Sequence, residues 1–89
     1  MTIPTFTYDE DMGGYVCGPF TIDGKATVNI ELAGLAPVVT LKMEEDGEYA
    51  NYGQTPKESD RYEIDIKSNE EITVKLATPV EVKKCYIIN

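Results

Sequence analysis

Residues 61–77 carry the clearest pattern in the chain, an alternation of apolar and charged side chains on both sides of a short polar segment. A repeat of two is typical of β-strands that bury one face and expose the other. The apolar positions of this pattern are Ile64, Ile66, Ile72, Val74 and Leu76. The pattern predicts a β-hairpin that is closed by the loop Ser68-Asn69-Glu70.

The length of that loop determines the register of the hairpin. A three-residue loop sets Ile66 opposite Ile72 and keeps the apolar face continuous. On the outer face, the same register forms two pairs of opposite charge, Lys67 with Glu71 and Glu63 with Lys75. Each such pair contributes a few tenths to about 1 kcal/mol, so the charges favour this pairing.

A second hairpin is predicted over residues 15–32. A two-residue Asp-Gly turn would set an apolar residue beside a charged one. A three-residue loop, Ile22-Asp23-Gly24, instead sets Phe20 opposite Ala26 and places its glycine where a positive φ is needed. We therefore expect the longer loop.

Two more segments with apolar alternation, residues 38–44 and 80–88, are expected to form strands. A short opening strand is expected at residues 5–9. Residues 38–44 precede the turn Asp46-Gly47, and a two-residue turn there sets Met43 opposite Ala50 and Leu41 opposite Tyr52.

The last expected strand covers residues 80–88, and its alternation fails at Lys84. A β-bulge at Lys83-Lys84 would return Cys85 and Ile87 to the buried face.

These segments amount to about eight short strands at intervals of roughly ten residues, separated by turns rich in Gly, Pro, Asn and Asp. The spacing is typical of an all-β protein, a single antiparallel β-sandwich or jelly roll. Residues 1–89 contain no internal repeat and no composition change that would indicate a second domain.

The net charge of the chain limits the classes of molecule that we expect it to bind. Eight basic and sixteen acidic residues give a net charge of −8, which repels nucleic-acid phosphates and anionic lipids. No apolar run approaches the roughly 18–20 residues that a membrane span requires. We therefore expect neither a nucleic-acid nor a membrane partner.

The chain offers little for catalysis. It has no histidine, and its two serines, Ser59 and Ser68, lie in predicted turns. Its carboxylates fall mostly at outward strand positions or in turns, and the acidic loops lack the spacing of a known calcium site. We expect no enzyme activity, no metal and no cofactor. Cys17 and Cys85 are expected to be small buried side chains, with a bridge between them as the alternative.

Two groups of residues are candidates for binding. The segment after the Asp46-Gly47 turn combines aromatic and amide side chains, and its predicted exposed set is Tyr49, Asn51 and Gln54. Such a set suits a carbohydrate or a protein surface. The second group comprises apolar residues outside the alternating core face, Leu35, Val38 and Ile88. They are candidates for an assembly interface.

The segment EEITVKLATPVEVKKCYIIN, residues 70–89, resembles the closing strands of small β-sandwich modules in bacteriophage virions, and GEYANYGQTP, residues 47–56, is similar to the same modules. These modules include head-fibre, capsid-decoration and receptor-binding domains. The resemblance implies a non-enzymatic structural protein, made in the host cytoplasm and carried on the exterior of the phage particle. It also implies a homo-oligomer, with a trimer favoured, and a capsid protein as a possible second partner.

Two other functions remain open at this point. One is a carbohydrate-binding module that uses Tyr49, Asn51 and Gln54. The other is an acidic interaction protein directed at a host component.

Overall fold

The computed structural model describes residues 3–54 and 58–89, with the backbone alone at residues 52–54. Its strands, in chain order, are β1 (Thr7–Asp9), β2 (Gly14–Ala36), β3 (Thr40–Glu45), β4 (Glu48–Gln54), β5 (Ser59–Thr78) and β6 (Val82–Ile88). The all-β prediction is confirmed. The described residues include no helix long and apolar enough to cross a membrane.

All six strands belong to one antiparallel sheet. The strand order is β1-β2-β5-β3-β4, and β6 pairs with residues 27–32 of β2. The prediction of about eight short strands is wrong, because β2 and β5 run for 23 and 20 residues. The sandwich or jelly-roll arrangement stays a prediction, since the strands are joined in a single hydrogen-bonded sheet.

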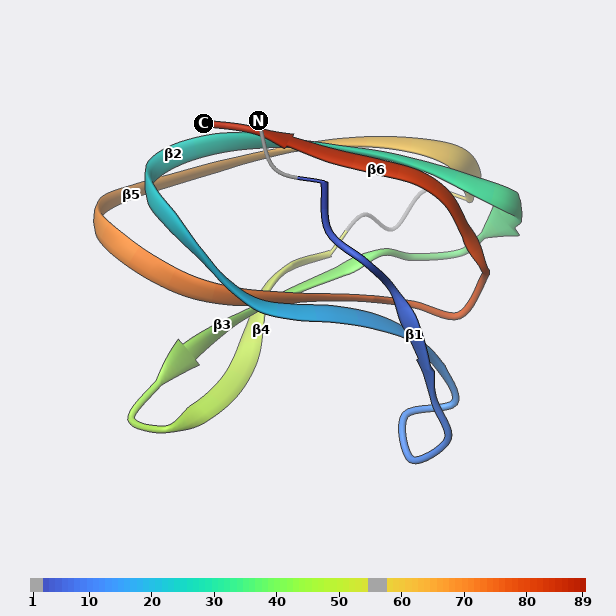
Figure 1. The fold of residues 1–89 in the computed structure, drawn as a ribbon, viewed down its shortest axis with the longest axis horizontal. Helices are drawn as coiled ribbons and strands as arrows, with labels where there is room; N and C mark the ends of the chain where they lie inside the picture. The colour runs from blue at the N-terminus through green and yellow to red at the C-terminus, as the bar shows by residue number, and fades with distance from the viewer. Residues whose placement is uncertain (1–2, 55–57) are drawn as a thin grey trace.

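The sheet is sharply bent, because β2 and β5 turn together and continue as partners on both sides of the bend (Figure 1). The bend lies at Gly24 in β2 and at residues 68–70 in β5, which the paired register leaves out. One side of the bend is the three-stranded half, formed by β6, the later part of β2 and the earlier part of β5. The other side is the five-stranded half, formed by β1, the first part of β2, the last part of β5, β3 and β4.

Both predicted long hairpins are therefore wrong. Residues 15–32 and 61–77 do not fold back on themselves, and each pairs with the other. Ile66 lies opposite Ala26, and Ile72 lies opposite Ile22. The turn-forming residues were correctly placed, but they make a corner through which two strands pass side by side.

The predicted charge pairs are lost with the hairpin. Lys67 lies opposite Lys25, and Glu71 lies opposite Asp23, so like charges face each other at the corner. Exposed cross-strand charge pairs are worth at most about 1 kcal/mol, which is less than the burial of one large apolar side chain. Burial of the apolar face therefore outweighs the charge pattern.

The core lies on the inner face of the bent sheet, between its two halves. Its largest fully buried side chains are Ile22, Leu41, Ile66, Leu76, Ile87, Val28, Val39 and Val74. They come from β2, β3, β5 and β6, and from the segment before β3. The buried Tyr62 hydroxyl donates a hydrogen bond to the Ala36 carbonyl oxygen, which satisfies its polar end inside this apolar layer.

Two local predictions are confirmed. The register of β6 shifts between Lys84 and Val82, so a bulge at Lys83 leaves Cys85 and Ile87 buried. The turn between β3 and β4 is Asp46-Gly47, and both residues have positive φ.

The register between β3 and β4 agrees with the prediction only near the turn. Met43 lies opposite Ala50, as expected. A register shift then sets Leu41 opposite Gly53 and not opposite Tyr52.

A test of the β2–β5 pairing is offered by Gly18, which lies in a bulge of β2 opposite Lys75. Its φ is +101°, and a β-carbon there would lie 2.8 Å from the Val74 carbonyl oxygen. We expect Gly18→Ala to lower the free energy of unfolding by about 1–3 kcal/mol in a denaturant titration.

The matched control for this substitution is Gly34→Ala. A β-carbon at Gly34 would meet its nearest neighbour, Val80 Cγ1, at 3.9 Å, which is ordinary contact. The control should change stability by less than about 0.5 kcal/mol. Equal effects at the two glycines would contradict the observed path of β2 along β5.

Candidate functional site

The inner face of the sheet is occupied by the core, so any binding surface has to use the outer faces or the strand edges. The two halves of the sheet turn their outer faces in opposite directions (Figure 1). Each outer face carries a shallow hollow, and the side chains around the two hollows differ in chemistry.

The hollow of the five-stranded half is mainly apolar and has a volume of about 350 Å³. Its floor crosses three strands, because Val16 lies opposite Ala77 and Ala77 lies opposite Thr40. It is bordered by Met12, Gly13, Gly14, Val16, Val38, Thr40, Lys42, Asn51, Ala77, Thr78 and Pro79. We call this surface the apolar hollow.

The structure brings two of the predicted binding residues together there. Half-buried Val38 and exposed Asn51 both border the apolar hollow. Tyr49 lies on the same strand as Asn51, and the Lys75 ammonium nitrogen sits 4.2 Å from the centre of its ring. One ring face of Tyr49 is therefore covered by a cation. The backbone of Gln54 pairs with Thr40, and its side chain lies outside the described residues.

The other two predicted residues lie elsewhere. Leu35 is next to last in β2 and is 63% exposed. Ile88 ends β6 opposite Thr27 and is 49% exposed. Leu35, Val38 and Ile88 do lie outside the core, but the structure does not gather them into one patch.

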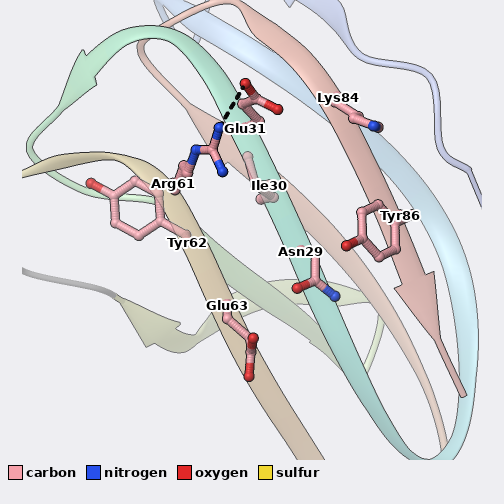
Figure 2. Close-up of a pocket in the computed structure, with 8 residues that line it drawn as sticks. All are labelled: Asn29, Ile30, Glu31, Arg61, Tyr62, Glu63, Lys84 and Tyr86. Carbon is pink, nitrogen blue, oxygen red and sulfur yellow. Dashed lines mark ion pairs between the residues drawn. The ribbon is translucent and has the colours of Figure 1, made fainter.

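The hollow of the three-stranded half is polar and has a volume of about 380 Å³. Its borders are Asn29, Ile30, Glu31, Arg61, Tyr62, Glu63, Lys84 and Tyr86, which come from β2, β5 and β6 (Figure 2). We call this surface the polar hollow. The sequence does not indicate this surface, because its residues lie far apart in the chain.

Cross-strand pairing arranges the outward side chains of this half in rows. In the first row Glu31 lies between Arg61 and Lys84. The Arg61 Nη2 atom lies 3.5 Å from Glu31 Oε1, and the Lys83 ammonium lies 3.8 Å from the same oxygen. Glu31 is the more buried member of both ion pairs. These pairs restrict the side chains of this row, which lies at one end of the polar hollow.

The next row is Glu63, Asn29 and Tyr86, with Asn29 in the middle. Figure 2 shows the Tyr86 side chain directed toward Asn29 across the hollow, with Glu63 on the opposite strand. Within the described part of the chain, the side chains of these three residues make no hydrogen bond or ion pair. Their polar atoms are therefore open to solvent or a ligand.

The following row is closed by an internal hydrogen bond. Thr27 Oγ1 donates to Asp65 Oδ1 at 2.9 Å, and Ile88 completes the row on β6. The unpaired row of Glu63 and Asn29 thus lies between two rows whose side chains hold one another in place.

The thiols Cys17 and Cys85 are both free and buried, as the sequence predicted. The pKa of each thiol is raised from 9.0 to about 12, by burial at both positions and at Cys17 also, to a smaller extent, by the charge of a nearby Cys85 thiolate. Both thiols are therefore protonated at neutral pH and behave as small apolar groups. Across residues 3–54 and 58–89, no group of three or more ligating side chains is placed to hold a metal ion.

Comparisons with known proteins give no relatives. No protein-family model, curated protein or solved structure matches this chain.

The raised thiol pKa values predict how stability changes at alkaline pH. Between the unfolded pKa of 9.0 and the native pKa of about 12, the native state keeps protons that the unfolded chain loses. The stability that each neutral thiol contributes is therefore complete below about pH 9 and is lost as the pH rises toward about 12.

We expect the double variant Cys17→Ala/Cys85→Ala to lose stability less steeply than the native protein above about pH 9. Urea titrations at about pH 8 and about pH 10.5 would measure the difference, and comparing the two proteins at each pH removes the effects that they share. Parallel slopes would contradict the assigned burial of the thiols.

Proposed function

We propose that the protein is a non-enzymatic structural or accessory component of a phage virion, of the capsid-decoration or head-fibre type, and that it acts through protein–protein assembly. The apolar hollow is the observation that supports assembly. The virion setting is supported by the resemblance of residues 47–56 and 70–89 to virion modules.

The apolar hollow departs from the pattern of a sheet face that meets water. Outward positions of such a face are normally polar. Here Val16, Val38 and Ala77 are apolar and only partly exposed. Apolar patches on soluble proteins mark contact surfaces, and burial contributes roughly 25 cal/mol for each Å² of apolar area.

The occupant that we propose is Leu35 of a second copy of this chain. Its side chain is 63% exposed and does not border the hollow of its own chain. The one charged residue at the described border of the hollow is Lys42, so an apolar side chain can enter without covering a carboxylate.

The symmetry of the assembly follows from that contact. Leu35 and the apolar hollow are different surfaces, so the contact is heterologous, and a heterologous contact that closes forms a ring. Three copies are the number that the resemblance favours.

Light scattering across a concentration series tests the assembly. The native protein should approach a mass of about three times 9.9 kDa. Leu35→Glu and Val38→Glu should each shift it toward 9.9 kDa, because either change sets a carboxylate in the apolar contact. We expect the dissociation constant to rise at least about 100-fold.

The matched control is Thr21→Glu, which adds the same charge at an exposed strand position opposite Thr73. It should leave the mass unchanged, and circular dichroism should show that all three variants are folded. A native protein that stays monomeric at high micromolar concentration would refute self-assembly through this face.

The virion setting has its own test. The chain should purify with phage particles in a fixed ratio to a capsid or tail protein. Absence from the particles, together with an intact ring in solution, would reject the virion setting and leave the assembly in place.

A further inference from the structure

We infer that the polar hollow is a binding site for a neutral saccharide, with Tyr86, Asn29 and Glu63 as its contact residues. This site lies on the three-stranded half and shares no residue with the apolar hollow. It therefore does not depend on the proposed assembly.

The three contact residues have no side-chain partners among the described residues. Asn29, Glu63 and Tyr86 lie in one row across three adjacent strands, and within the described residues their side chains form no hydrogen bond or ion pair. Asn29 and Tyr86 are nevertheless half-buried, so their orientation is restricted by the sheet. A ligand here would meet unused polar groups without first breaking contacts within the protein.

The chemistry of these three side chains matches the groups that a sugar ring presents. An asparagine amide both donates and accepts hydrogen bonds, and a carboxylate accepts from hydroxyl groups. Asn29 and Glu63 lie directly opposite each other, so together they can bind neighbouring hydroxyls of one ring. Tyr86 supplies an aromatic face for the C–H side of the ring and a hydroxyl at its polar end.

The surroundings hold this set in position. On one side Glu31 is paired with Arg61 at 3.5 Å, and on the other Thr27 is hydrogen-bonded to Asp65 at 2.9 Å. Binding groups whose neighbours are fixed lose less conformational entropy when the ligand arrives. The volume of about 380 Å³ and the open shape suit one or two sugar units at the surface of the sheet.

The preference for a neutral sugar follows from Glu63. A carboxylate within the contact set repels the carboxylate of an acidic sugar, and the net charge of −8 adds to that repulsion. Lys84 borders the hollow and has no ion pair among the described residues, so it is available as a hydrogen-bond donor to a ring hydroxyl.

Tyr49 is the less suitable tyrosine, although its neighbours Asn51 and Gln54 made it the sequence candidate. The Lys75 ammonium at 4.2 Å occupies one face of its ring. Among the described residues, no other aromatic ring and no cation contacts the ring of Tyr86. The two tyrosines therefore provide matched variants for a test.

The 89-residue chain would be applied to an array of neutral and acidic oligosaccharides. Saturation-transfer NMR with glucose, galactose, N-acetylglucosamine and glucuronic acid at millimolar concentration would follow.

We expect binding of at least one neutral sugar. Tyr86→Ala should weaken it at least about tenfold, and Asn29→Ala several-fold, while Tyr49→Ala should change it less than about twofold. Thermal melts would confirm that the variants are folded.

Three outcomes would overturn the inference. The first is that the native protein binds no sugar on the array or by NMR. The second is that Tyr49→Ala abolishes binding and Tyr86→Ala does not. The third is binding restricted to acidic sugars, lost in Lys84→Ala and kept in Tyr86→Ala.

Discussion

The pairing of β2 with β5 is the constraint on which the rest of the structure depends. It runs from Tyr15 opposite Thr78 to Ala36 opposite Ser59, through the corner. β1 and β6 attach to β2, β3 attaches to β5, and β4 attaches to β3. Because both central strands bend together, their apolar face closes on itself, and a chain of 89 residues obtains one core from one sheet. These pairs are distant in sequence, so the core cannot form before the two strands meet.

The sequence predicted the buried face of β5 correctly, but not which strands lie together. Alternation identified Ile66 and Ile72 as inward residues, and this is correct. The same alternation fits a strand that turns back on itself and a strand that bends beside a distant partner. The charges favoured the hairpin, since Lys67 would then face Glu71, yet Lys67 faces Lys25. Exposed charge pairs contribute too little to decide between the two arrangements.

Local features were predictable because their causes are local. A glycine after Asp46 satisfies the positive φ values of a two-residue turn, and a failed alternation at Lys84 requires a bulge. The polar hollow has no such local signal. Asn29, Glu63 and Tyr86 become neighbours only when three strands are paired in one register, whereas Tyr49 and Asn51 are already close in the chain and were therefore the predicted candidates.

The bent sheet also separates the two proposed contacts. The apolar hollow and the polar hollow lie on the outer faces of opposite halves, with the core between them. In a ring each copy would use Val38 and its neighbours on one half and Leu35 on the other, and neither Leu35 nor Val38 borders the polar hollow. Several copies in a ring would then present several equivalent polar hollows, and weak sugar contacts would add up through multivalency. A shallow site on a sheet face, with modest affinity alone, is physically suited to such repeated use.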